Sequence, residues 1–403
     1  MKMKSLLKSL IQHNVARRTP IDGAAKKLRH TLFAGFFCCA ALYATQQASA
    51  AEVIVGQVAP LTGVLAETGK DMVLGAKIYF DHINATGGIN GNKIKHLVRD
   101  DGYVVDKTIA LTNELLDKEK AHVLFGYAGT GNISKILADG ILAKANVALV
   151  APYTGGTALR DPYNPYIFHI RASYLDETKA MVDYFVKNGI TRIAVFYQGD
   201  AFGESGLAGV EKALAAHRLA PVVKASYPKN TTEVTPAVKT ILAADPQAIC
   251  MISVNKSTAA FVKEYKASGK QPFMFNISVV NPKDMAAQVG ADTMRGVGIT
   301  QVVPYPFYAS TKITTEYLDL LKKYGGKDAA PSYTSFEEFI GAKVLVEGIK
   351  RAKGLQREKI IEGLASLEKF DVGGFTVNFG TNKRVGSSFV DIAVIGKNAQ
   401  LIR

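Results

Sequence analysis

Several residue types and patterns are scarce in this 403-residue chain, and each scarcity excludes a class of protein. The chain contains no tryptophan and only three cysteines, too few for a disulfide framework or a cysteine-rich zinc site. No apolar run reaches the roughly 18–20 residues of a membrane-spanning helix, which excludes a polytopic membrane protein. No long polar or proline-rich tract indicates disorder. With 48% apolar residues, the chain can bury sizeable cores, and its length predicts two domains.

Catalytic signatures are also missing. The first turn after a predicted strand, residues 56–63, lacks G-x-G-x-x-G and contains Pro60; no G-x-x-x-x-G-K-[ST] occurs, and residues 203–206 are not G-x-S-x-G. The histidines, such as His82 and His96, stand alone rather than at metal-ligand spacing. The Glu337-Glu338 pair is expected to face solvent on a helix. We therefore expect no enzyme, no metal and no cofactor.

The N-terminus has the features of an export signal. A basic stretch precedes an apolar run of 14 residues, 31–44, and Ala48-Ser49-Ala50 supplies the small residues that signal peptidase needs. We expect cleavage after Ala50, secretion by the Sec pathway and a soluble mature protein in the periplasm. The basic stretch is unusually long for such a signal, which leaves a start codon further downstream as an alternative. Cys38 is a possible lipidation site, but bulky residues precede it.

The charge of the chain falls when this leader is removed. The leader holds eight of the 49 basic residues and one of the 35 acidic residues, so the net charge drops from +14 to +7. The remaining basic residues do not form dense runs with interleaved aromatics, so no nucleic-acid partner is expected. Cys250 is the one cysteine left, and its apolar surroundings predict an inert core residue.

From residue 52 onward, apolar strands alternate with amphipathic helices, which predicts parallel βαβ units. The expected strands are 52–59, 93–99, 122–125, 147–151, 192–197, 222–227, 248–253, 273–276, 296–303, 375–379 and 389–394, the last two as a pair. The expected helices are 70–86, 106–118, 133–144, 178–187, 204–216, 234–244, 257–268, 310–324 and 333–352.

Two runs of βα units, followed by a third segment, predict an α/β fold of two lobes. The chain would cross between the lobes near residues 170, 300 and 373, and these crossovers would form a hinge. Lobe one would hold 51–170 and 301–373, and lobe two 171–300 and 374–403. A parallel sheet binds ligands beyond the carboxyl ends of its strands, so the site is expected between the lobes.

The loop from Gly126 to Asn132 is the most informative of the loops at these strand ends. It is rich in small residues, carries the Thr130 hydroxyl and begins a helix, where backbone N–H groups suit a carboxylate. The alternative is that Thr130 or Asn132 only caps the helix. A second Gly/Thr-rich loop, residues 153–157, follows the neighbouring strand and favours the anion site.

The chain resembles the periplasmic solute-binding proteins of branched-chain amino acid ABC transporters, which have the type I fold. The resemblance rests on Asp81 to Gly91, close to "INA-x-GGI-x-G", on Asp100-Asp101, on Asp106 to Ala110, and on Ala201-Phe202-Gly203. It covers essentially residues 52–395. It implies a receptor that captures a small molecule by lobe closure, works as a monomer and delivers its ligand to an ABC permease and ATPase.

The resemblance also implies a set of ligand-binding positions in this chain. They are Thr68, Ala128, Gly129, Thr130, Tyr153, Thr154, Gly155, Phe202, Asn255, Asn276, Ile277 and Ser278. Gly155 stands where the family usually has Thr, and Phe202 keeps the ring of the family's Tyr without its hydroxyl.

The family's acidic partner for a ligand ammonium is missing from residues 276–281. Because a buried ammonium without an acid is costly, the chain favours a carboxylate ligand without an amine, such as an aromatic acid. Asp200 or Glu204 could still supply an acid, and an amino acid ligand remains open. The alternative function is a ligand-sensing receptor or regulator of the same fold; a secreted enzyme is disfavoured, because the chain offers no set of nucleophile and base.

Overall fold

Residues 51–380 and 382–403 are described by a computed structural model. The expected export signal, its cleavage site and Cys38 lie outside these residues. Among the described residues, no helix combines the length and the apolar character that crossing a membrane requires.

The first sheet consists of five parallel strands in the order β2-β1-β3-β4-β5. Helices cover both of its faces, so its inner strands are largely apolar; Val53, Val55 and Val58 of β1 are fully buried. We call the part of the chain around this sheet lobe one. The strands are β1 (Glu52–Ala59), β2 (Lys93–Asp100), β3 (Val123–Phe125), β4 (Leu149–Val150) and β5 (Ile167–Phe168).

The second sheet has seven strands in the order β14-β13-β10-β9-β8-β6-β7, and we call the part around it lobe two. Strands β6 to β10 are parallel, whereas β13 and β14 run antiparallel at one edge. Its strands are β6 (Ile193–Gln198), β7 (Val223–Tyr227), β8 (Ala248–Ile252), β9 (Phe273–Asn276), β10 (Gly298–Gln301), β13 (Asp391–Ile395) and β14 (Leu401–Ile402).

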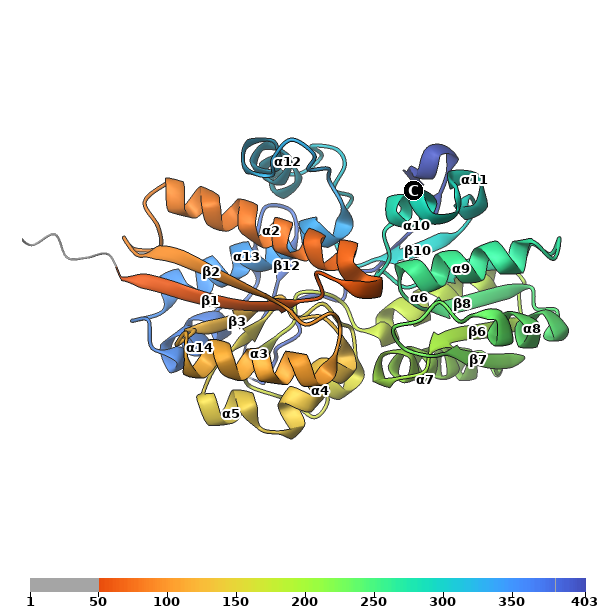
Figure 1. Cartoon of the computed structure of the whole chain (residues 1–403), viewed down its shortest axis with the longest axis horizontal. Coiled ribbons are helices and arrows are strands. Elements are labelled where there is room, and N and C mark those ends of the chain that lie inside the picture. The colour runs from red at the N-terminus through yellow and green to blue at the C-terminus, as the bar shows by residue number, and fades with distance from the viewer. Residues whose placement is uncertain (1–50, 381) are drawn as a thin grey trace, which may run out of the picture. The chain divides into compact units, whose positions relative to one another are not determined.

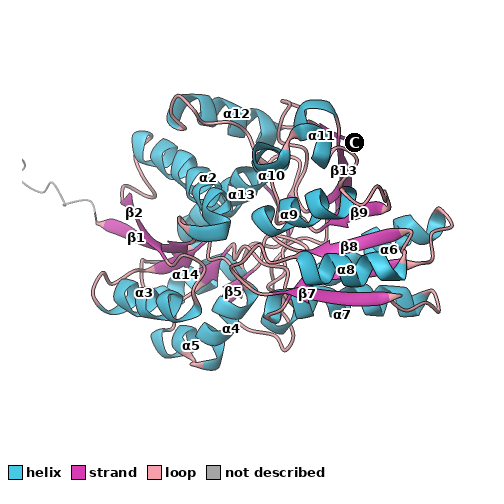
Figure 2. Ribbon diagram, turned by 45° about the vertical axis from the view of Figure 1, so that its right-hand side comes forward, coloured by secondary structure: helices cyan, strands magenta, loops and turns pink. Residues whose placement is uncertain are grey.

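Helices flank both sheets, as Figure 1 shows, and Figure 2 shows loops between the two sets of strands. Lobe one has α2 (Ala66–Ala85), α3 (Val105–Asp117), α4 (Thr130–Ala138), α5 (Ile141–Ala145), α12 (Lys312–Tyr324), α13 (Tyr333–Arg351) and α14 (Arg357–Ala365). Lobe two has α6 (Tyr174–Lys187), α7 (Ala201–Ala216), α8 (Thr235–Ala244), α9 (Asn255–Lys266), α10 (Pro282–Val289) and α11 (Ala291–Met294). The short 3-10 helices are η1 (Gly63–Leu65), η2 (Thr157–Leu159) and η3 (Lys397–Ala399).

The chain passes between the sheets after β5, after β10 and before β13. A small hairpin of β11 (Phe370–Asp371) and β12 (Thr376–Val377) precedes the last passage. Val385 then forms a β-bridge with His169, directly after β5 of lobe one. These pairings favour a third crossover between 386 and 391 rather than near 373, while the division into lobes stays a prediction.

The structure differs from the sequence-based expectations in several elements. The helix expected at 133–144 is two helices, because Gly140 adopts a left-handed conformation with φ of +68° between α4 and α5. The two last strands do not pair: residues 376–377 pair with β11, and β13 pairs with β10 and β14. Strand β5 and helices α10, α11 and α14 were not expected, since short segments show too little periodicity.

Cys250 lies in β8, and its side chain is fully buried. Burial raises the pKa of its thiol to about 12, so at neutral pH the reactive thiolate is almost absent. The expectation of an inert core cysteine is therefore confirmed.

Candidate functional site

The twelve ligand-binding positions inferred from the sequence are all buried. They lie at the carboxyl ends of strands in both sheets, in the loops there or in the first turns of the helices that follow. Four of them, Ala128, Gly129, Tyr153 and Phe202, line one cavity of about 20 Å³ between the lobes. The other residues that line this cavity are Leu65, Tyr103, Tyr174, Val254 and Val279. Since a single water needs about this much space, a larger solute requires the lobes or side chains to move.

The start of α4 forms one side of this site. Gly129 has φ of +96° and is the residue before the first helical turn, with no side chain that caps the helix. Ile133 donates the first backbone hydrogen bond, to the Gly129 carbonyl at 3.1 Å. The N–H groups of residues 130–132 therefore have no acceptor within the helix, and they form the type of anion site that helix N-termini provide.

The Thr130 hydroxyl does not cap this helix; it lies 2.7 Å from the Thr154 hydroxyl. Thr154 Oγ1 also accepts a hydrogen bond from the Gly156 N–H at 3.1 Å. Asn132 uses its amide for Thr108 and Lys229 instead of the helix end. The alternative that Thr130 or Asn132 serves only as a helix cap is therefore wrong, and the two threonine-bearing loops meet as expected.

Tyr174 lines the cavity and was missed by the sequence reasoning. Its ring packs against Phe202 edge-on, with centroids 5.5 Å apart. A Cβ atom at Gly155 would lie 2.5 Å from the Tyr174 ring. Gly155 therefore departs from the family's Thr because the ring of Tyr174 takes the place of that side chain.

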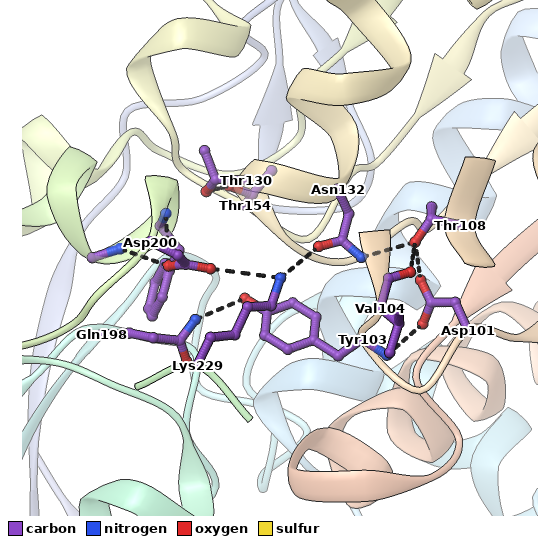
Figure 3. Close-up of polar contacts among 12 residues, drawn as sticks. Asp101, Tyr103, Val104, Thr108, Thr130, Asn132, Thr154, Gln198, Asp200 and Lys229 are labelled. Carbon is purple, nitrogen blue, oxygen red and sulfur yellow. Dashed lines mark hydrogen bonds and ion pairs between the residues drawn. The ribbon is translucent and has the colours of Figure 1, made fainter. Parts of the chain in front are cut away.

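Tyr103 is the second aromatic residue that the sequence reasoning missed. It follows Gly102 and has φ of +64°, an unusual conformation for a bulky residue and one that concentrates at functional sites. Asp101 holds the loop by accepting hydrogen bonds from the Tyr103 N–H and the Thr108 hydroxyl. Figure 3 shows this loop beside Gln198 and Lys229 of lobe two; the Gln198 amide donates to the Tyr103 hydroxyl at 3.4 Å.

Thr68 and Asn255 meet across the lobes, where the Asn255 amide donates to the Thr68 hydroxyl at 3.2 Å. Asn276 donates its two amide hydrogens to the carbonyls of Ser253 and Ile277, at 3.0 and 2.8 Å. Asn276 therefore supports the loop that carries Ile277 and Ser278, and its amide donors are already used.

A buried arginine and a buried acid stand beside this loop. Glu177 of α6 accepts hydrogen bonds from the Ser278 N–H, at 2.8 Å, and from the Thr300 hydroxyl. Arg171 donates to the Ser278 hydroxyl, and its guanidinium lies 4.5 Å from the centre of the Tyr153 ring. Glu177 thus lies beside the loop where residues 276–281 lack an acid. The negative charge of Glu177 already interacts with the positive charge of Arg171.

The expectation that Glu337 and Glu338 face solvent is wrong. Glu337 is buried and forms an ion pair with Arg171, with Nε and Oε1 3.2 Å apart; burial raises the pKa of Glu337 to about 7, although Arg171 opposes this. Glu338 is fully buried, and neither of its oxygens has a hydrogen-bond partner. Burial raises its pKa well above the usual range, because α13 packs against α2 and the first sheet on this side.

Known proteins with the same architecture match this chain in sequence and in structure. The family model described as "Periplasmic binding protein" matches residues 52–399. A substrate-binding periplasmic protein from Ralstonia solanacearum has a similar structure, with a TM-score of 0.83, 37% identity and coverage of 87% of this chain and 99% of that one.

Two further relatives carry names that mention amino acids. A possible leucine/isoleucine/valine-binding protein from Rhodopirellula baltica gives a TM-score of 0.83 at 28% identity, covering 89% of this chain and 98% of the other. "Leu/Ile/Val-binding protein homolog 8" from Brucella abortus is 24% identical over 84% of this chain and 86% of its own length. This chain therefore belongs to the periplasmic binding protein family, whose members here are solute-binding proteins related to leucine/isoleucine/valine binders rather than enzymes.

Proposed function

We propose that this protein captures a small organic acid without an amine, preferably an aromatic one, between its lobes and delivers it to the permease and ATPase of an ABC importer. The observation that supports this most is the pairing of a helix N-terminus with an aromatic cavity wall. We further propose that it works in the periplasm as a monomer.

The carboxylate of the solute would bind at the start of α4. The free N–H groups there point along the helix axis, and the Thr130 hydroxyl lies beside them. The positive end of the helix dipole adds to these hydrogen bonds. A negative charge is stabilised better here than elsewhere in the cavity, because the remaining lining is mostly apolar.

The body of the solute would contact aromatic rings. Tyr103, Tyr153, Tyr174 and Phe202 line the same cavity, and rings of this kind favour stacked or edge-on contacts with another ring. The side chains of Leu65, Val254 and Val279 complete an apolar wall. An apolar or aromatic group therefore matches this lining better than a polar one does.

An α-ammonium group fits less well. Glu177 is the nearby acid, but one of its oxygens already accepts two hydrogen bonds, from Ser278 and Thr300. Arg171 contacts the same Ser278 and would repel a second cation. The other oxygen of Glu177, Oε1, has no hydrogen-bond partner, but the charge of this carboxylate already stabilises Arg171. An enclosed ammonium would lose its hydration and compete with Arg171 for Glu177, so an amine-free acid is favoured.

A thermal-shift panel at matched concentrations tests this proposal. It compares benzoate, phenylacetate and 3-phenylpropionate with leucine, isoleucine, valine and phenylalanine. A bound solute raises the melting temperature in proportion to RT ln(1 + [L]/Kd), so the aromatic acids should give the largest shifts. If the branched-chain amino acids gave the largest shifts and the aromatic acids none, the amine argument would fail and Glu177 would become the ammonium partner.

A further inference from the structure

Lys229 lies at the junction of the two lobes and is not among the residues expected from the sequence. It follows β7 of lobe two, and Asp200 follows the neighbouring strand β6 and caps α7. The Lys229 ammonium lies 3.5 Å from Asp200 Oδ2, and the side chains are only 20% and 16% exposed, respectively. Within its own lobe, Lys229 therefore has one acidic partner.

The other contacts of Lys229 reach across to lobe one (Figure 3). Its ammonium donates a hydrogen bond to Asn132 Oδ1 at 2.9 Å. It also lies 3.9 Å from the centre of the Tyr103 ring, well within the range of a cation–π interaction. Asn132 belongs to the first turn of α4, and Tyr103 is a wall of the cavity.

The surroundings of Lys229 make these contacts stronger than those of a surface lysine. Burial lowers the pKa of Lys229, although Asp200 opposes this shift. Hydrogen bonds and cation–π contacts gain strength when water is excluded. Tyr103 OH also accepts from Gln198 of lobe two, so lobe two holds this ring at two points.

We infer that Lys229 is a positioning residue for solute capture: from lobe two it engages Asn132 and Tyr103 of lobe one, and so couples lobe closure to the placement of one cavity wall. The inference builds on the proposed function only in taking lobe closure as the capture step. Lys229 needs no contact with the solute for this role, because its contacts with Asn132 and Tyr103 form only when the lobes meet.

The test uses a cysteine pair at the same junction. A Cβ built on Gly131 would lie 3.8 Å from the Cβ of Ala201, which is the usual spacing in a disulfide. In the Gly131→Cys/Ala201→Cys protein, the rate of disulfide formation with oxidised glutathione reports the closed fraction. In the Ala201→Cys protein, the rate of thiol labelling measures the intrinsic reactivity of this thiol, since residue 201 is exposed. Dividing the first rate by the second corrects disulfide formation for changes in thiol reactivity, so this ratio follows the closed fraction.

Lys229→Met should lower this ratio by about fivefold, the effect of losing one net hydrogen bond. Lys229→Arg should restore most of it, since Arg can make the same two contacts. Asn132→Ala should lower the ratio as well, and combining it with Lys229→Met should add less than the sum of the two effects. Circular dichroism and thermal unfolding confirm that each variant is folded.

Lys224→Met is the matched control, because Lys224 lies on β7 and pairs with Glu211 of the same lobe at 2.8 Å. It removes the same charge and should leave the ratio unchanged. Equal ratios for Lys229→Met and its parent, or an equal fall for Lys224→Met, would overturn the inference. The assay contains no solute, so it decides the role of Lys229 even if the solute panel contradicts the proposed function.

Discussion

The hydroxyl of Thr130 provides the sharpest test of the carboxylate site. Thr130→Val keeps the shape of the side chain and removes one hydroxyl, which in the structure lies 2.7 Å from Thr154 Oγ1. A hydrogen bond to a charged group contributes about 2 kcal/mol, so the variant should bind the best acid of the panel about thirtyfold more weakly. The lost bond to Thr154 should separately cost about 1 kcal/mol of folding stability.

Calorimetry on the panel's best acid measures the affinity, and chemical denaturation measures the stability. Thr112→Val is the matched control: Thr112 is another fully buried threonine of lobe one, and its hydroxyl donates to the Thr108 carbonyl at 2.6 Å. It should cost similar stability and leave the affinity unchanged. An unchanged affinity in folded Thr130→Val would place the carboxylate elsewhere and refute the reasoning about α4.

Three further predictions concern other parts of the chain. Gly155→Ala should destabilise the protein by about 1–3 kcal/mol, because its new Cβ would lie 2.5 Å from the Tyr174 ring; chemical denaturation should show this loss, and equal stability would mean that the ring moves aside freely. Burial raises the pKa of Glu338 in the folded protein. The folded state therefore loses stability relative to the unfolded state as the pH rises above about 4.5, the pKa of an exposed glutamate. Glu338→Gln should therefore gain stability relative to the parent between pH 5 and pH 8, and an identical pH dependence in both proteins would contradict a protonated buried carboxyl. Terminal sequencing of the protein exported by its native host should find Ala51 first, whereas a terminus that retains residues 31–44, or a lipid on Cys38, would rule out the expected cleavage.

The sequence predicted most of the alternating elements because long buried strands and amphipathic helices leave a clear periodicity. Strand β1 and strand β9 were predicted at their observed bounds. The meeting of Thr130 and Thr154 was also predictable, since carboxyl ends of adjacent parallel strands lie at one edge of a sheet.

The residues that were missed depend on distant packing. Tyr103 reaches the cavity because its backbone adopts a left-handed conformation, and a tyrosine in a sequence does not predict this conformation. Tyr174 explains Gly155 only once α6 lies against that loop. Glu337 and Glu338 have the sequence pattern of a solvent-facing pair, and only Arg171, more than 160 positions away, shows why one of them is buried. No local periodicity carries this kind of information.

The buried thiol of Cys250 has a practical consequence for measuring solute uptake. From residue 51 onward the chain has no other cysteine and no tryptophan, and Cys250 is shielded inside β8. Cysteines introduced at one exposed position in each lobe would thus be the main targets of maleimide dyes without any change to the core. A single indole placed in lobe two would emit without background from other tryptophans. The molecule is in effect a ready scaffold for a fluorescent sensor of whichever solute it captures.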